Sequence, residues 1–318
     1  MDALRPLRGT PSRPSSFGAP LRALREASER VPFLLRAAYV FPPFWFATHL
    51  DLLRPLLDPP PMEPIWPVAW LELVDPSVGA PLIMVFGLAA AMLGALMPER
   101  RWVRAAVFFG MLEVLALQYS FGKIHHLMHG WLYALGIWAA FVPDVAFRPD
   151  CATRAERAAG LLGFSAARYM LALTYSLAGL GKLLGSLYQL FMGQVTPLHP
   201  SSLAIHVADR LVQTYPRSIL GPFMIEHGTL QWPLMLLTLY LQTFALWAAF
   251  RPALFRVWGV GLIGFHVVTG LSLTIDFTPN ILLLGVLFVA SPEAPHQVGW
   301  KEVARALPGA GWLRARAK

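Results

Sequence analysis

The sequence predicts an all-α fold: a polytopic integral membrane bundle of about eight transmembrane helices, with short amphipathic helices on its outer face. Three observations support this prediction. The chain of 318 residues is 56% hydrophobic and only 14% charged, whereas soluble domains carry about 25% charged residues. Its apolar residues gather in eight runs with a length near the roughly 20 residues that a helix needs to cross a bilayer. Its basic residues gather in every second loop between those runs.

The eight apolar runs are expected to be helices, because a lone strand would leave its backbone polar groups unpaired in lipid. The first run begins beside Arg36 and is interrupted by Pro42 and Pro43. The last is short and contains Pro279, so we expect it to be tilted or only partly inserted. The predicted spans are 33–53, 79–97, 105–121, 127–147, 159–181, 229–250, 257–275 and 278–290.

The placement of the basic residues predicts the topology. Twenty of the 26 Lys and Arg residues lie before the first span, in three alternate loops or in the C-terminal tail. Cytoplasmic segments of membrane proteins carry such an excess, so we expect both termini on the cytoplasmic side. This pattern explains the net charge of +8 by topology and contacts with anionic lipids, and it argues against a nucleic-acid partner. The loop after the first span is acidic instead, with Asp51, Asp58, Glu63, Glu72 and Asp75.

The chain divides into three predicted parts. Residues 1–31 form a basic cytoplasmic tail that ends in a short surface helix, residues 32–292 form the transmembrane domain, and residues 293–318 form a second basic cytoplasmic tail. We expect a multi-pass protein of a bacterial inner membrane. The single cysteine, Cys151, excludes an intramolecular disulfide and a cysteine-based metal site.

The long connection at 182–228 is expected to lie on the outer face. Loops of this length in compact domains are commonly functional or carry their own short helices. Ser201 or Ser202 is a suitable helix cap, and apolar residues follow at helical spacing. We therefore expect a pair of short helices on, or dipping into, the outer leaflet, where they offer a contact for a membrane protein partner. The alternative is a plain connector.

Two charged residues lie deep inside predicted spans. Glu113 and Arg168 each lie about nine residues from the cytoplasmic end of their span, which at about 1.5 Å per residue places both roughly 13 Å deep. A charge in mid-bilayer costs about 2.5–3.5 kcal/mol on insertion scales and usually has a partner or a function. We predict that Glu113 and Arg168 form a buried ion pair, with a structural role favoured over a catalytic one.

Histidines are densest at the outer end of the fourth span, in the run FGKIHHLMHGWLY at 121–133. His125 and His129 share one helix face, because residues four apart lie one above the other, and His126 lies about 100° away. Two imidazoles at this spacing can bind a metal, but the chain has only one such run, so we predict no metal site and keep His125 with His129 as the alternative. Interfacial histidines that merely hydrogen-bond to neighbouring helices or lipid head groups are a further interpretation.

Two more polar residues are predicted to belong to the site. Lys182 ends the run YSLAGLGK, in which Gly179 and Gly181 allow close approach of another helix or a ligand. It is either a snorkelling lysine or, where it is desolvated, a base. His266 lies near the middle of the seventh span between glycines, where an imidazole needs a polar neighbour and is a candidate for proton transfer or ligand binding.

The order of these features resembles a known membrane family. A histidine element at the outer start of one span, an AGxxK run ending the next, an outer amphipathic segment and a late FH pair follow one another. This is similar to the transmembrane module of the vitamin K-dependent gamma-carboxylases and of the bacterial HTTM (horizontally transferred transmembrane) domain proteins. The resemblance implies that Lys182 is the base that deprotonates a reduced quinone. It places His126 or His129 near the family's first histidine and His266 at its late one.

The chain also departs from this family. Gly181 replaces the first lysine of the family's lysine pair, and His125 and His126 stand near the places of its two asparagines. Only about 26 residues follow the last predicted span, which leaves no counterpart of the large lumenal domain that helps to bind a protein substrate. We therefore do not expect carboxylation of protein glutamate, and the resemblance leaves a membrane enzyme that acts on a quinone or another lipid.

Three functions remain open at this point. The first is a carboxylase-like lyase or oxidoreductase, with Lys182 as base and His126, His129 and His266 stabilising the resulting anion; a reduced quinone-type lipid is then the substrate or cofactor. The second is a non-catalytic lipid-binding or complex-assembly subunit. The third is a transporter, which the absence of repeated halves in the sequence disfavours.

Overall fold

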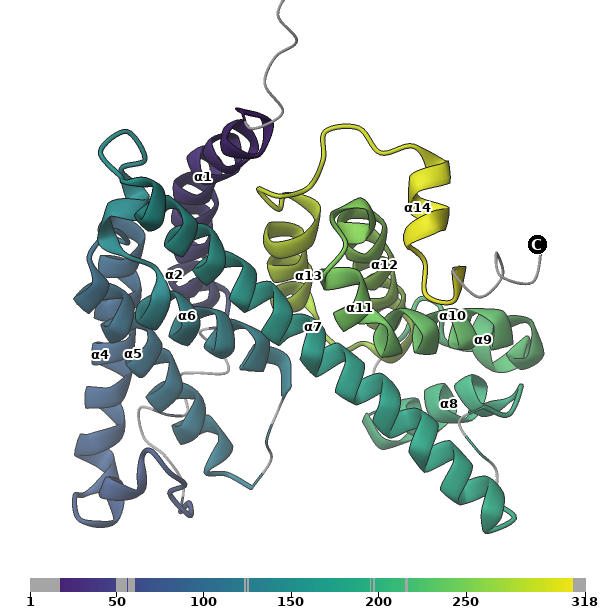
Figure 1. The fold of residues 1–318 in the computed structure, drawn as a ribbon. Coiled ribbons are helices and arrows are strands. Elements are labelled where there is room, and N and C mark those ends of the chain that lie inside the picture. The colour runs from purple at the N-terminus through teal and green to yellow at the C-terminus, as the bar shows by residue number, and fades with distance from the viewer. Residues whose placement is uncertain are drawn as a thin grey trace, which may run out of the picture.

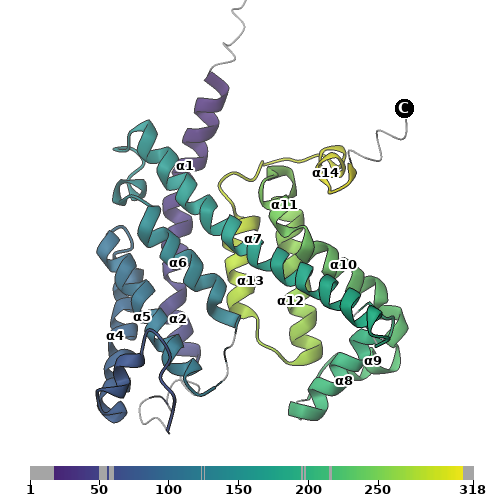
Figure 2. The same ribbon diagram turned by 60° about the horizontal axis from the view of Figure 1, so that its bottom comes forward.

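The computed structural model describes residues 18–49, 56, 61–122, 124, 126–194, 196, 198–214 and 217–310. The regular elements within these ranges are all helices. The long helix α7 (Arg154–Phe191) crosses the molecule between two groups of helices (Figures 1 and 2). It packs against α1 and α6 on one side and against α10 and α11 on the other.

The group that precedes α7 consists of α1 (Gly18–Tyr39), α2 (Phe41–Thr48), α4 (Pro76–Leu96), α5 (Arg101–Tyr119) and α6 (His129–Phe141). The group that follows consists of α8 (Ser202–Thr214), α9 (Gly221–Glu226), α10 (Trp232–Thr243), α11 (Ala245–Ala249), α12 (Phe255–Leu273) and α14 (Trp300–Ala306). Helix α13 (Thr278–Leu284) lies between the groups and contacts both α6 and α12 (Figure 2). Short 3-10 turns are η2 (Ala69–Glu72), η3 (His126–Met128), η4 (Asp144–Phe147), η5 (Gly228–Gln231) and η6 (Pro252–Leu254), and α13 continues as a π-helical turn, η7 (Gly285–Val289).

Four helical segments in the described ranges are long and apolar enough to cross a membrane: Pro76–Leu96, Arg101–Tyr119, Arg154–Phe191 and Pro252–Leu273. The other four predicted spans are helical but short or interrupted. Helix α6 has 13 residues, and α10 and α11 are separated at Phe244. The first span is broken at Val40, because Pro42 at the start of α2 has no amide to continue the ladder.

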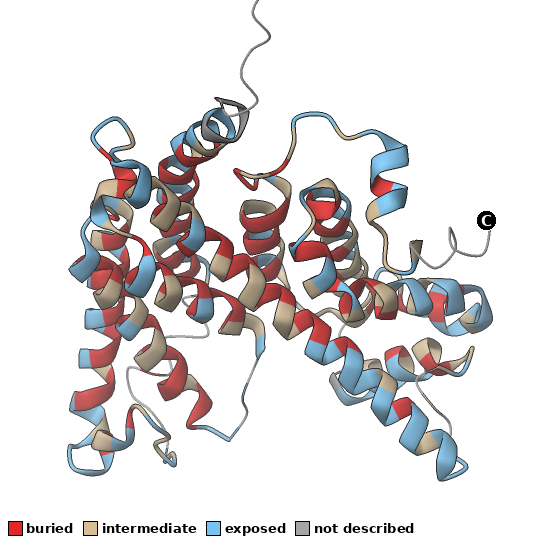
Figure 3. Ribbon diagram, in the orientation of Figure 1, coloured by how far each residue is buried: buried red, intermediate tan, exposed pale blue. Residues whose placement is uncertain are grey.

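The outward side of α4 is apolar, as a lipid-facing helix requires. Val78, Leu82, Val85, Met92 and Leu96 are all exposed, and they recur at helical spacing, so they cover one face. Figure 3 shows this exposed stripe on the side of α4 that faces away from the bundle. A long helix whose exposed face is apolar is stable in hydrocarbon rather than in water.

The inward side of α4 is lined with small residues that let α5 approach. A Cβ atom added to Gly87 would lie 2.7 Å from a methyl group of Val114, and one added to Gly110 would lie 3.0 Å from the Gly87 Cα. Membrane helices commonly associate through such small residues, because lipid supplies no hydrophobic force between helices. The small size of these residues therefore allows the close contact between α4 and α5.

Basic residues close the end of α6. Arg104, fully buried, donates to the carbonyl oxygens of Pro98, Trp138 and Val142, and its Nη2 lies 3.1 Å from the Asp144 carboxylate. The last carbonyls of a helix have no partner within the helix and carry partial negative charge. Some of the positive charge that marks the predicted cytoplasmic edge thus stabilises helix ends.

The predicted ion pair between Glu113 and Arg168 is wrong. Arg168, 1% exposed, lies 2.6 Å from the carboxylate of Glu293 and 2.8 Å from the hydroxyl of Ser291. Glu113 has the Trp70 side chain as its hydrogen-bond partner instead. The two side chains face different neighbours, because α5 packs on α4 and α6, while Arg168 points from α7 towards the segment after η7.

Two boundaries also differ from the prediction. The expected surface helix at 21–31 is the first part of α1, which runs on through Pro32 to Tyr39. Helix α7 continues to Phe191, about ten residues beyond the predicted end of the fifth span. The pair of short helices in 182–228 is confirmed as α8 and α9. The predicted tail at 1–17 and His125 lie outside the described residues.

Candidate functional site

His266, near the middle of α12, is the most unusual polar group of the described bundle. It is 4% exposed, and its Nε2 lies 2.5 Å from the hydroxyl oxygen of Tyr175 on α7. Its other ring nitrogen, Nδ1, is buried and has no hydrogen-bond partner among the described residues. Because a buried polar atom without a partner costs about 1–3 kcal/mol, such an atom calls for an explanation.

The hydrogen bond with Tyr175 restricts what the free nitrogen can do. A neutral imidazole has one N–H donor and one acceptor nitrogen. When the Tyr175 hydroxyl donates to Nε2, Nδ1 carries the proton and can donate to a ligand oxygen. When Nε2–H donates to the phenol oxygen, Nδ1 is an acceptor for a ligand hydroxyl. Either arrangement leaves one hydrogen-bonding position of His266 for a ligand.

A cavity of about 390 Å³ lies beside this histidine, and His266 forms part of its wall. The turn after α12 shapes the cavity: Thr274 has a left-handed backbone, with φ of 55°, which ends the helix and reverses the chain towards α13. This reversal brings the Phe277 ring to 4.5 Å from the imidazole, measured between ring centres. The remaining lining residues include Arg217, Ile219, Val267, Gly270, Leu271, Asp276, Thr278 and Ile281.

The segment before α9 forms the other side of this cavity. The Ser218 hydroxyl lies within hydrogen-bond distance of the carbonyl oxygens of Leu271 and Ser272, and the Leu220 amide donates to the Leu271 carbonyl. These bonds fix the segment to the end of α12 and place Arg217 in the cavity wall. The cavity therefore has an aromatic and aliphatic interior, a buried imidazole and charged groups at its edge.

The histidine pair at the start of α6 forms a separate group. His126 and His129 approach each other through their Nδ1 atoms at 3.2 Å, and the His129 ring lies edge-on to Tyr119 at 5.9 Å. The described residues contain no group of three or more His, Cys, Asp or Glu side chains able to hold a metal ion. The alternative pair of His125 with His129 involves a residue outside the described ranges.

Lys182 belongs to a third group. As a residue it is exposed, but its amine donates to the amide oxygen of the buried Gln242 on α10 at 2.9 Å. One turn earlier, a Cβ atom on Gly179 would lie 2.5 Å from the Thr243 backbone nitrogen, whereas Gly181 has nothing within 4 Å. The expected close approach of another helix is therefore confirmed at Gly179, and the lysine hydrogen bond lies beside this contact.

The cavity beside His266 contains none of the other predicted catalytic residues. Its wall includes neither Lys182, His126 nor His129. Tyr175 and Lys182 lie on the same face of α7, but seven residues separate them, which is about 10 Å along a helix. A cavity that Lys182 and the three histidines share stays a prediction.

No family model matches this sequence, and no curated protein or solved structure matches it either. The geometry of the site therefore carries the functional argument.

Sequence reasoning identified His266 but missed its partners. Tyr175 lies in the fifth span within the run LTYSLAG, and a tyrosine deep in an apolar run is a signal because a buried phenol usually finds a hydrogen-bond partner. Arg217 and Asp276 lie in segments that read as ordinary loops. Asp276 follows α12 directly in the chain, but only the fold places Arg217 beside it in the cavity wall.

Proposed function

We propose that this chain is a multi-pass membrane protein that binds the polar head group of a quinone-like or other amphiphilic lipid at His266, from the non-cytoplasmic leaflet. One observation carries the proposal: the buried Nδ1 of His266 has no partner in the described bundle, and the same residue forms part of a cavity wall. A ligand oxygen in that cavity completes the hydrogen bonding of the imidazole.

The membrane topology belongs to the same proposal. We place all eight predicted segments in a bacterial inner membrane, with both termini in the cytoplasm. The short helix α6 is compatible with this arrangement because it packs between α5 and α7, and irregular or short segments are tolerated at membrane depth where protein covers them. The exposed apolar stripe of α4 and the alternating basic loops support the same arrangement.

The walls of the cavity favour a flat apolar head group with oxygen atoms. Phe277, which lines the cavity, has its ring centre 4.5 Å from that of His266. Binding sites of this kind combine a mainly apolar lining with a few polar groups that fix orientation. A quinone or hydroquinone ring fits such walls, and one of its oxygen atoms supplies the missing partner of Nδ1.

The HTTM-like mechanism would assign proton abstraction to Lys182. Lys182 is instead hydrogen-bonded to Gln242, and it lies about 10 Å along α7 from Tyr175. Both facts favour a different assignment of roles to these residues. We assign the contact with the head group to His266 and Tyr175, which can pass a proton between them. Lys182 then holds α7 against α10, and a role as base requires that a second part of the ligand reaches it.

The test is the retention of a defined quinone by the purified protein. Detergent-solubilised wild type, incubated with a ubiquinone or a menaquinone and examined by native mass spectrometry, is expected to keep about one molecule. His266→Gln should lower the affinity by about tenfold, the effect of losing a hydrogen bond to a buried group. His206→Gln, on the exposed side of α8, is the matched control and should bind as wild type does. Equal retention by all three proteins contradicts the proposal.

The alternative, a non-catalytic lipid-binding or complex-assembly subunit, has an observation of its own. The last turns of α7 expose Leu184, Leu187, Tyr188 and Phe191, and this end of the helix projects from the bundle beside α8 (Figure 1). A partner protein can cover this surface. Fixed-ratio co-purification that is lost in Tyr188→Glu, with quinone retention unchanged, would favour this function over the first.

A further inference from the structure

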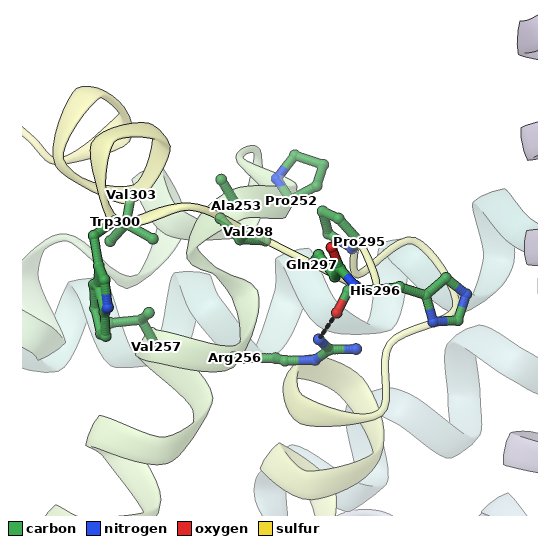
Figure 4. A pocket seen from close by; sticks show the side chains of 10 residues that line it. All are labelled: Pro252, Ala253, Arg256, Val257, Pro295, His296, Gln297, Val298, Trp300 and Val303. Carbon is green, nitrogen blue, oxygen red and sulfur yellow. Dashed lines mark hydrogen bonds between the residues drawn. The ribbon is translucent and has the colours of Figure 1, made fainter.

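A second cavity lies at the start of α12 (Figure 4). Its volume is about 410 Å³, and it is formed where the start of α12 meets the segment that leads into α14. Its principal walls are Arg256, Val257, His296, Val298, Trp300 and Val303. Ten residues separate Arg256 from His266, so the two cavities are about 15 Å apart along the helix.

Arg256 supplies the positive charge of this cavity. Its Nη1 donates to the His296 carbonyl oxygen at 3.1 Å (Figure 4). Its Nε and Nη2 groups have no hydrogen-bond acceptor among the described residues. An arginine held at one nitrogen presents the rest of its planar fork in a fixed direction, which suits a phosphate or carboxylate.

The surroundings add positive charge without a compensating acid. Arg30 of α1 makes a short contact with Nε2 of His296, and none of the ten lining residues is acidic. Of the two acids nearest along the chain, Glu293 is already occupied, since it accepts from Arg168 and Ser165, and Glu302 is exposed and does not line the cavity. The cavity is therefore suited to a negatively charged group.

The other walls are apolar and open to the outside. Val257, Val298 and Val303 line the cavity, and Trp300, 82% exposed, stands at the start of α14. Tryptophan is enriched where a membrane protein meets the head-group region. A cation beside apolar walls and an exposed tryptophan is complementary to an amphiphile with an anionic head and a hydrocarbon tail.

We propose that this cavity binds the phosphate diester of an acidic phospholipid from the leaflet opposite the His266 site. Arg256 contacts the phosphate through its two free donor groups, and Val257 with Trp300 contacts the glycerol and the first part of an acyl chain. The site is independent of any ligand at His266, and either one can exist without the other.

The experiment measures lipid binding by the full chain. Delipidated wild type in detergent is titrated with phosphatidylglycerol or with phosphatidylcholine, and bound lipids are counted by native mass spectrometry. We expect one phosphatidylglycerol to bind about tenfold more tightly than phosphatidylcholine, because the choline cation offsets the phosphate charge and is repelled by the arginines at the cavity. Arg256→Gln should remove this preference. Arg251→Gln is the matched control: Arg251 stacks on Trp247 nearby but does not line the cavity.

A cavity-filling variant and a competition with phosphate identify the ligand. Val257→Trp, at a partly exposed position on the cavity wall, fills the space and should displace the lipid while the melting temperature stays near that of the wild type. Inorganic phosphate at millimolar concentration should not compete. Full competition by phosphate shows a site for free anions and overturns the lipid assignment. Retention of the lipid preference by both Arg256→Gln and Val257→Trp overturns the site itself.

Discussion

The buried arginine of α7 provides the sharpest test of the packing. Arg168→Leu removes a 2.6 Å ion pair with Glu293, a 2.8 Å hydrogen bond to Ser291 and the stacking of the guanidinium 4.1 Å above the Phe255 ring. Loss of one partner of a buried pair is expected to lower the free energy of unfolding by about 3–5 kcal/mol. The Glu293 side chain is 29% exposed, so water can compensate it in part, and we expect a value near 3 kcal/mol.

A double-mutant cycle separates the pair from general damage. Glu293→Gln combined with Arg168→Leu should be less destabilising than the sum of the two single changes, with a coupling of about 1–3 kcal/mol, because residues in one network are not additive. Glu113→Gln is the control, since the structure gives Glu113 a different partner. Its coupling to Arg168 should be about zero, as for residues without a shared contact.

The assay is SDS titration in mixed micelles, followed by tryptophan fluorescence. Additive effects of Arg168→Leu and Glu293→Gln, or a strong coupling of Arg168 to Glu113, would refute the packing described here. Arg168→Lys should fall between wild type and Arg168→Leu, because a lysine keeps the charge but not the planar fork that bonds two partners at once.

Three more perturbations follow from the structure. Tyr175→Phe removes the hydroxyl that meets the buried imidazole. It should weaken quinone retention several-fold and, because Nε2 of His266 loses its partner, lower the free energy of unfolding by about 1–3 kcal/mol, as measured by native mass spectrometry and SDS titration. Gly179→Ala places a Cβ against the backbone of Thr243 and should lower the free energy of unfolding by about 1–3 kcal/mol. Gly181→Ala, with open space around it, should instead stabilise α7 by about 0.5–1 kcal/mol. The reverse order in SDS titration would contradict the α7–α10 contact. The Ser77 backbone amide donates to the Asp75 carboxylate at the start of α4 and lowers the pKa of this acid. The stabilisation by this hydrogen bond is therefore complete above the pKa of Asp75 in the unfolded chain, about 4. It is lost as the pH falls through the lower pKa of Asp75 in the folded protein. The melting temperatures of wild type and Asp75→Ala should therefore converge in acid, and a gap that stays constant with pH would count against the cap.

The sequence predicted the helical class and the position of most helices, because apolar runs of this length are typical of helices. It did not predict α14, which lies in the segment expected to be a tail. It could not predict which helices are long enough to cross on their own. The break between α10 and α11 at Phe244 has no neighbouring proline or glycine from which it could be predicted. The π-helical turn at Gly285–Val289 likewise depends on packing around the segment.

The site was predicted only in part, for a geometric reason. Sequence counting gives the depth of His266, Lys182 or Arg168, but packing decides which neighbour each faces. Thus His266 was correctly singled out as a mid-span polar residue, while its partner Tyr175 and the separate contact of Lys182 with Gln242 required the three-dimensional arrangement. The wrong pairing of Arg168 with Glu113 has the same origin.

Electron cryo-microscopy of the protein in lipid nanodiscs supplied with a menaquinone shows whether the cavity beside His266 binds a quinone head group. We expect head-group density beside Phe277, with an oxygen atom about 3 Å from Nδ1 of His266, and loss of that density in His266→Gln. A cavity that holds only acyl chains, or an Nδ1 atom that meets a side chain of the protein itself, would contradict this expectation.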